Sequence, residues 1–285
     1  MPKLLTQEQI DQFREQGYVS PVRIMSEQEA TLVRQKVEAF ESAQGRGLYG
    51  LQVTKCALLF PWIYDIVSRD NLLDAVEDLI GEDILMYQNG AWFKEPSSDA
   101  YVSWHQDSTY YGIDPLDMIT CWIALSDASE ESGCMQVIEG SQKLGQLPVE
   151  YTELTPDNLL ASGQNTILEK ETASIATMPL RPGEMSIHHV CTVHSSLPNR
   201  GNDRRMGFSV AYMGPHVAQT TELKATAMLM RGKDSFGLYE PEIPPVAADD
   251  PGTIERHERA VTLYRDKAKE AGNQTAWRLN KKPAA

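Results

Sequence analysis

The sequence lacks any apolar run of the roughly 20 residues that a helix needs to cross a lipid bilayer. We therefore expect no membrane-spanning segment in its 285 residues. An apolar signal segment with a small-residue cleavage site is also missing after Met1, which favours a cytoplasmic protein. The cysteines form no CxxC pair, so reduced and buried thiols are expected rather than a disulfide framework at Cys56, Cys121, Cys134 and Cys191.

Basic residues are scarce relative to acidic ones. The chain has 26 Lys and Arg against 40 Asp and Glu, a formal charge of -14. Proteins that bind phosphate backbones need clustered Lys and Arg, so this balance argues against a nucleic-acid partner. We expect a small-molecule substrate and a monomer or homodimer.

The first 82 residues carry the signals of helices. Capping boxes, in which Ser or Thr is followed three residues later by Glu or Gln, begin helices at Thr6 and Ser26. Each helix is followed by a glycine that can end it. Pro61 can begin a third helix, and an apolar stripe over residues 72–80 predicts a fourth.

Beyond Gly81 the pattern changes to that of strands. Short runs rich in β-branched and aromatic residues, separated by Gly, Pro, Ser and Asp, predict strands at residues 84–87, 91–93, 101–104, 120–125, 135–138, 184–189 and 205–213. This spacing is typical of a sandwich or barrel. Residues 253–271 read as an amphipathic, charged helix with His257 at its surface. No repeat or linker divides the chain, so we expect one domain over residues 1–285, with a helical part (1–82), a β core (83–215) and a C-terminal extension (216–285).

The triplet His105-Gln106-Asp107 ends one of the expected strands. Because side chains alternate along a strand, His105 and Asp107 face the same side. One more histidine from a distant strand would complete the facial triad of two His and one carboxylate that holds Fe(II) and leaves other coordination positions open. His188, His189 and His194 can all be considered for that role, and His194 is preferred. The alternative interpretation of His188 and His189 is that they are histidines of the protein core.

An arginine opens the strand that follows His194. A planar guanidinium can grip the distal carboxylate of 2-oxoglutarate with two hydrogen bonds. Arg204 and Arg205 should face opposite sides of the same strand. Arg205 is the preferred candidate, and the other arginine would lie at the surface.

With these elements the chain resembles the phytanoyl-CoA dioxygenase family of Fe(II)- and 2-oxoglutarate-dependent oxygenases. The resemblance extends from about residue 84 to 213 and includes the H-x-D element and an H-x-S-x-x-N element that begins at His194. It implies a mainly β fold with helices, whose core is a double-stranded β-helix (jelly roll, cupin-like) with the N-terminal helices packed on one sheet.

The same resemblance implies roles for individual residues. His105, Asp107 and His194 would bind the metal and be the catalytic residues. Arg205 would bind 2-oxoglutarate, and the other residues implied for the co-substrate pocket are Ser196, Trp122 and Lys94. Asp107 is retained, whereas the related halogenases have Ala or Gly at that position. The expected reaction is therefore hydroxylation, which consumes O2 and 2-oxoglutarate and releases succinate and CO2.

Substrate contacts are expected at the mouth of the barrel, from Trp92, Gln106, Tyr110, Tyr111 and Arg231. A small polar metabolite or a natural-product intermediate is the expected substrate. The alternatives are a non-catalytic binding protein of the same fold and a cupin-type enzyme that depends on zinc or manganese. The arginine placed for a distal carboxylate has no obvious use in the zinc or manganese enzyme.

Overall fold

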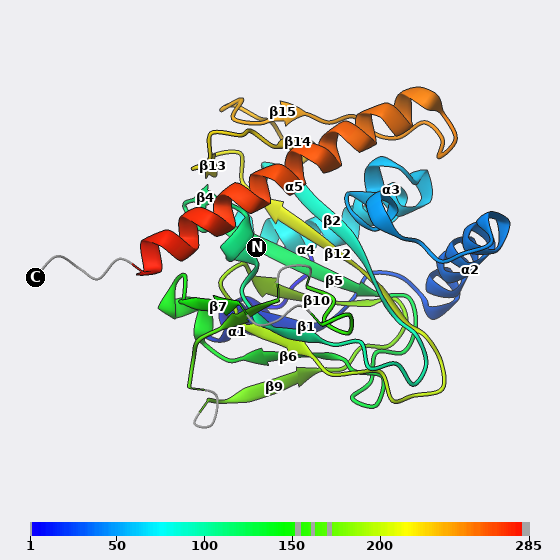
Figure 1. The fold of residues 1–285 in the computed structure, drawn as a ribbon, viewed down its shortest axis with the longest axis horizontal. Coiled ribbons are helices and arrows are strands. Elements are labelled where there is room, and N and C mark those ends of the chain that lie inside the picture. Colours follow the sequence, from blue (N-terminus) through cyan, green and yellow to red (C-terminus); the bar gives the residue numbers. More distant parts are fainter. Residues whose placement is uncertain (1, 152–154, 161–162, 170–172, 281–285) are drawn as a thin grey trace, which may run out of the picture.

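The computed structural model describes residues 2–151, 155–160, 163–169 and 173–280. Its centre is formed by two β-sheets (Figure 1). The major sheet has, in spatial order, strands β1 (Tyr18–Arg23), β10 (Glu184–His189), β5 (Met118–Ala124), β12 (Arg205–Met213), β2 (Ile84–Lys94), β14 (Thr226–Arg231) and β15 (Glu240–Pro241). The minor sheet has the order β3 (Val102–His105), β11 (His194–Ser196), β6 (Met135–Ile138) and β9 (Ile175–Met178).

Strands that are distant in sequence pair within both sheets. The pairings within the two sheets are antiparallel except for that of β14 with β15. Two small ladders join β4 (Ile113–Asp114) to β13 (Ala218–Gln219) and β7 (Val149–Tyr151) to β8 (Gln164–Thr166). The arrangement is a jelly-roll core, as the sequence predicts.

The N-terminal helices cover one face of the major sheet, as expected. They are α1 (Gln7–Gln16), α2 (Glu27–Gln44), α3 (Pro61–Val67) and α4 (Asp70–Ile80). Both expected capping boxes are formed, at Thr6 and at Ser26. Helix residues such as Ile10 and Ile63 share one buried cluster with Cys121 and Ile123 of β5. Thr120 and Trp122, which alternate with them, face the opposite side of the sheet.

Strand β2 corrects the expectation of two separate runs over residues 84–87 and 91–93. It is one strand of eleven residues. Gln88, Asn89 and Gly90 continue its ladder with β12. The Asn89 carboxamide oxygen accepts a hydrogen bond of 2.7 Å from the backbone N–H of Ala57, which satisfies a buried polar group inside the strand.

The C-terminal extension ends in α5 (Pro251–Asn280), a longer helix than expected, which crosses over β14 and β2 in Figure 1. Residues 281–285 of that extension lie outside the described residues. His257 is not at the surface: it is 2% exposed, and its Nε2 lies 2.9 Å from the carbonyl oxygen of Thr54. Short 3-10 helices span Gly50–Val53, Cys56–Leu58, Asp107–Tyr110 and Ser141–Leu144. None of the described helices combines the length and apolar character needed to span a membrane.

Candidate metal centre

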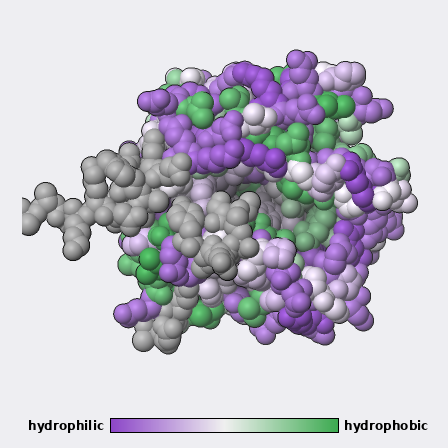
Figure 2. Space-filling model, in the orientation of Figure 1, coloured by the Kyte–Doolittle hydropathy of each residue, from purple (hydrophilic) through white to green (hydrophobic). Residues whose placement is uncertain are grey.

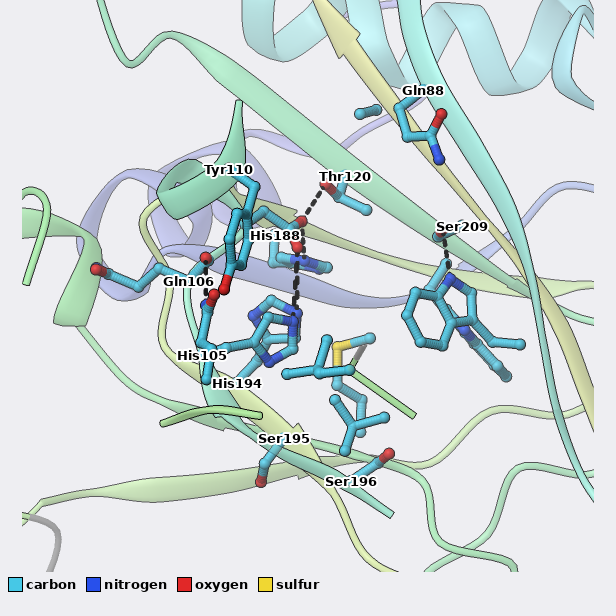
Figure 3. Close-up of a pocket in the computed structure, with 18 of the residues that line it drawn as sticks. Gln88, His105, Gln106, Tyr110, Thr120, His188, His194, Ser195, Ser196 and Ser209 are labelled. Carbon is cyan, nitrogen blue, oxygen red and sulfur yellow. Dashed lines mark hydrogen bonds and ion pairs between the residues drawn. The ribbon is translucent and has the colours of Figure 1, made fainter. Parts of the chain in front are cut away.

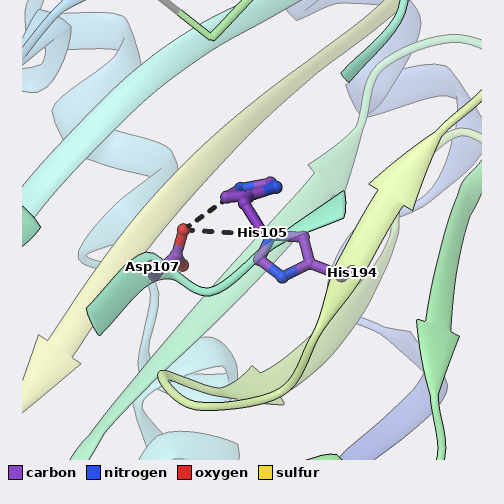
Figure 4. Close-up of side chains that lie close together, drawn as sticks. All are labelled: His105, Asp107 and His194. Carbon is purple, nitrogen blue, oxygen red and sulfur yellow. Dashed lines mark ion pairs between the residues drawn. The ribbon is translucent and has the colours of Figure 1, made fainter. Parts of the chain in front are cut away.

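Three ligand groups meet between the sheets. His105 is the last residue of β3, and His194 is its partner at the start of β11. Their ring centroids are 4.0 Å apart. Asp107 begins the short helix Asp107–Tyr110, and one ligand atom from each of the three residues lies within 4.8 Å of the others (Figure 4). Two remote segments of chain therefore bring two imidazoles and one carboxylate together.

Hydrogen bonds orient the two imidazole rings. Nδ1 of His105 lies 2.9 Å from the carbonyl oxygen of Ser103, and Nδ1 of His194 lies 2.9 Å from that of Thr192. A carbonyl oxygen can only accept, so Nδ1 donates in each ring, and Nε2 is the nitrogen left to bind a metal. Nε2 of His105 and Nε2 of His194 lie 3.6 and 3.8 Å from Oδ1 of Asp107. Nε2 of both rings thus lies on the side of the carboxylate.

The protonation states of these groups suit metal ligation. Burial and the neighbouring histidines hold the pKa of His194 well below its usual value, which keeps the ring neutral. Burial alone would raise the pKa of Asp107, but its contacts with His105 and His188 and the proximity of His194 hold it well below the ordinary range. A neutral imidazole and an ionised carboxylate are the forms that bind a divalent metal.

The candidate ligands open into a cavity of about 170 Å³ between the sheets (Figure 3). Figure 2 shows a hollow near the centre of the face on which α5 lies. The cavity is lined by residues of both sheets, of the short helix Asp107–Tyr110 and of α5, among them Gln88, Trp92, Tyr110, Trp122, His188, Ser196, Arg205, Ser209, Ala211 and Tyr264. A small organic molecule can therefore reach the three ligands.

Arg205 supplies a positive charge to the cavity. It is 2% exposed, and its Nε and one terminal nitrogen have no hydrogen-bond partner among the described residues. Its guanidinium carbon lies 4.6 Å from the centroid of the Trp122 ring. Burial lowers the pKa of Arg205 to about 10, so the group is still charged at neutral pH. Arg204 faces away and binds Glu41 and Glu95 at 2.7 and 2.9 Å, so of the two arginines Arg205 is the one in the cavity.

Lys94 and Ser196 lie beside this arginine. Lys94 is the ladder partner of Arg205, and its Nζ donates to Oγ of Ser196 at 2.7 Å and to the carbonyl oxygen of Leu197 at 2.5 Å. Burial, and then the charge of Arg205, lower the pKa of Lys94 to about 6. Ser196 and Trp122 line the cavity, whereas Lys94 supports Ser196 from behind it.

The residues expected to contact substrate fall into three groups. Trp92, Tyr110 and Tyr111 line the cavity, and the Trp92 indole donates to the hydroxyl of Ser209 at 2.8 Å. Gln106 also borders it but is fully buried, and its amide nitrogen donates hydrogen bonds to the carbonyl oxygens of Gly145 and Cys191, away from a ligand.

Arg231 requires a correction. It does not line the cavity; its guanidinium binds Asp74 at 2.6 Å and Glu77 at 2.9 Å on α4. Two acidic side chains of a neighbouring helix attract this arginine, which sequence spacing does not reveal. It is therefore withdrawn as a candidate substrate contact.

Several cavity residues were not singled out from the sequence. His188, considered there only as a rival ligand or a core histidine, lines the cavity with Nε2 3.5 Å from Oδ2 of Asp107. Alternation along β10 could have placed it, once the strand's inner face was known. Thr120 donates to the same oxygen at 2.7 Å. No sequence pattern around Gln88 or Tyr264 marks them as cavity residues, because the tertiary structure alone brings β2 and α5 to the cavity.

Comparison with known families gives a match over most of the chain. The family model described as phytanoyl-CoA dioxygenase (PhyH) matches residues 13–207. A probable alpha-ketoglutarate-dependent hypophosphite dioxygenase of Stutzerimonas stutzeri is 30% identical over 186 residues, which are 64% of this chain and 60% of that protein. The match thus spans less than two thirds of that relative. A methylphosphonate hydroxylase of Gimesia maris is 23% identical over 228 residues, 74% of this chain and 82% of that protein.

Solved structures extend the similarity to nearly the whole chain. The non-heme monooxygenase ThoJ in its apo form has a TM-score of 0.81 and 28% identity, covering 94% of this chain and 99% of that one. The non-heme alpha-ketoglutarate-dependent carbocyclase SnoK from nogalamycin biosynthesis has a TM-score of 0.61 and 25% identity, covering 77% of this chain and 90% of that one.

Proposed function

Because this chain belongs to the phytanoyl-CoA dioxygenase family, we propose that it is an Fe(II)- and 2-oxoglutarate-dependent oxygenase. It hydroxylates a small polar metabolite or a natural-product intermediate, using dioxygen and releasing succinate and CO2. The observation that carries the proposal is the buried guanidinium of Arg205, which has unpaired donors in the same cavity as His105, Asp107 and His194. A metal site alone would not need such a group.

The donor set fits the metal. Two imidazoles and one carboxylate that converge from one side are the ligands of non-heme Fe(II) oxygenases, and the other side is open to the cavity. When bound there, iron with 2-oxoglutarate and dioxygen supplies the oxidising power. Thr120 fixes Oδ2 of Asp107, which leaves Oδ1 directed at the two histidines.

Arg205 fits the co-substrate. Its unpaired donors match a carboxylate, and Trp122 supports the guanidinium plane. Ser196, held by Lys94, adds a hydroxyl nearby. The buried surroundings strengthen this charge pairing because water does not screen it. The chain thus binds, orients and shields the reactants, and the proposal needs no side-chain general base.

We further propose that residues 1–285 act as one catalytic unit in the cytoplasm, as a monomer or homodimer. The support for a single unit is that Tyr264 of α5 lines the same cavity as residues of both sheets. The retained Asp107 favours hydroxylation over halogenation. A zinc or manganese hydrolase of the same fold would have no use for Arg205.

Anaerobic addition of Fe(II) and 2-oxoglutarate tests the proposal. Chelation of iron by the keto acid should give a weak visible charge-transfer band. Asp107→Ala should abolish both the band and succinate formation. The separate variant Arg205→Ala should show the band and form succinate only at higher concentrations of 2-oxoglutarate, because it loses on the order of 2 to 4 kcal/mol of charge-assisted binding. Arg204→Ala is the matched control, because Arg204 faces away from the cavity.

Two results would contradict the proposed function. A folded, metal-loaded protein that shows no band with 2-oxoglutarate would not be an oxygenase of this class. Equal turnover in the Asp107 and Arg205 variants and the unaltered protein would remove the proposed roles of both residues.

A further inference from the structure

One row of side chains crosses the floor of the cavity. His188 of β10, Thr120 of β5, Ala211 of β12 and Gln88 of β2 are successive partners across four neighbouring strands, and all four line the cavity. The row begins beside the candidate metal ligands, where Thr120 contacts Asp107, and ends at Gln88. Figure 3 shows Gln88 on the opposite side of the cavity from His105 and His194.

The length of this row sets a distance. Neighbouring strands lie about 4.8 Å apart, so the two steps from Thr120 to Gln88 span roughly 10 Å. Ala211 lies between them, and its side chain is a single methyl group, so it leaves space in the cavity between Thr120 and Gln88. A molecule bound along the floor can therefore touch Gln88 while another part of it lies at the metal centre.

Gln88 has an unused acceptor. Its side-chain oxygen is buried and has no hydrogen-bond partner among the described residues. A buried carbonyl oxygen without a partner costs free energy, and an O–H or N–H group supplied by a ligand would recover it. His188, at the other end of the row, is 1% exposed; its Nδ1 has no hydrogen-bond partner among the described residues, and its Nε2 lies 3.5 Å from Oδ2 of Asp107. His188 and Thr120 are thus both directed at Asp107, whereas the oxygen of Gln88 at the far end of the row is left for a ligand.

The charges of the cavity limit what can bind. Among the described residues that line it, Arg205 is the sole Lys or Arg. Iron, Asp107, 2-oxoglutarate and Arg205 together carry no net charge, so the loaded site has no cation left for an anionic substrate. Burying an unpaired anion there would be costly. The walls are aromatic instead, formed by Trp92, Tyr110, Tyr111 and Tyr264.

Resting on the proposed function, we propose that Gln88 determines substrate specificity: its amide oxygen accepts a hydrogen bond from one end of an elongated neutral or cationic substrate whose other end lies at the metal centre, beyond Thr120 two strands away. The substrate class is thus an amide, alcohol or amine long enough to span the floor. Compact phosphorus oxyanions are excluded, because they carry negative charge and cannot reach both ends of the row.

Binding to the anaerobic Fe(II) and 2-oxoglutarate complex tests this inference by calorimetry, with substrate-stimulated succinate release as a second measurement. The probes are hypophosphite, methylphosphonate, and a panel of neutral and cationic amides, alcohols and amines of suitable length. At least one panel compound should bind more tightly than methylphosphonate. Gln88→Leu should weaken that compound by about tenfold, and Gln88→Glu should favour the amines over the neutral compounds.

Controls separate this inference from the proposed function. The charge-transfer band with 2-oxoglutarate should persist in both Gln88 variants, which shows that the metal centre is intact. Gln35→Leu, on the exposed face of α2, should bind the panel as the unaltered protein does. The inference is overturned if methylphosphonate or hypophosphite binds best, if no panel compound binds, or if Gln88→Leu binds the preferred compound unchanged. A protein without the band would instead refute the proposed function.

Discussion

The hydroxyl of Thr120 donates a hydrogen bond of 2.7 Å to Oδ2 of Asp107, the carboxylate oxygen turned away from His105 and His194. Thr120 lies on β5 of the major sheet, whereas the two histidines belong to the minor sheet. This contact fixes which carboxylate oxygen faces the histidines. It therefore makes the metal site depend on the packing of one sheet against the other.

Removing that hydroxyl should weaken metal binding. In Thr120→Val the shape is kept but Oδ2 loses its donor, so Asp107 can rotate away from the histidines. Loss of such an outer hydrogen bond typically costs 10- to 100-fold in metal affinity. Titration of the metal-free protein with Fe(II) or Co(II) measures the effect. Thr120→Ser keeps the hydroxyl and should bind normally; equal affinity in the Val and Ser variants would contradict the role.

Arg205→Met should stabilise the protein while it damages function. The guanidinium is buried with unpaired donors, and replacing an unpaired buried charge by an apolar side chain of similar length often raises stability by about 1 kcal/mol or more. We expect a higher melting temperature in the absence of ligands and a large loss of 2-oxoglutarate affinity. Arg204→Met, which breaks contacts with Glu41 and Glu95, should not raise the melting temperature. A less stable Arg205 variant would show that the group is satisfied in the free protein.

Gly207→Ala should weaken 2-oxoglutarate binding indirectly, by displacing Trp122. A Cβ atom at Gly207 would lie 2.3 Å from the Trp122 ring, too close for any real contact, so the indole must shift. Trp122 supports the Arg205 guanidinium, and 2-oxoglutarate affinity should therefore fall while Fe(II) affinity is retained. Gly47→Ala is a suitable control, because a Cβ there meets one flexible side-chain atom at 3.4 Å. Unchanged 2-oxoglutarate binding in Gly207→Ala would mean that the indole position is unimportant.

Lys267 of α5 should make stability depend on pH. It is fully buried, its Nζ lies 3.0 Å from the Tyr87 hydroxyl, and burial lowers its pKa from 10.5 to about 7. Between these values the unfolded chain binds a proton that the folded chain does not, so the free energy of unfolding rises with pH across this window. Below about pH 7 the contribution no longer changes.

Urea unfolding at about pH 7.5 and about pH 9 measures this dependence. The unaltered protein should gain about 2 kcal/mol relative to Lys267→Met over that interval. Lys269→Met removes an exposed lysine two residues further along α5 and should keep the slope of the unaltered protein. Parallel pH profiles for the Lys267 variant and the unaltered protein would show that this lysine titrates normally.

Local features of the chain were predictable because they depend on neighbours in sequence. The capping boxes at Thr6 and Ser26, the change from helical to strand periodicity near residue 84, and the shared orientation of His105 and Asp107 follow from backbone geometry alone. The break expected inside β2 was wrong, because pairing with β12 and the Asn89 side chain satisfy a polar stretch that looks like a loop.

The sequence by itself determined the family, the jelly-roll class and the chemical types of the candidate ligands, since these rest on motifs and on the periodicity of side chains. Only the tertiary structure decided that Arg205 and not Arg204 enters the cavity, that Arg231 binds α4, and that His188, Thr120 and Gln88 form one row. The physical reason is register: a row across a sheet joins residues that are far apart in sequence, and its members are fixed only when each strand has found its partner.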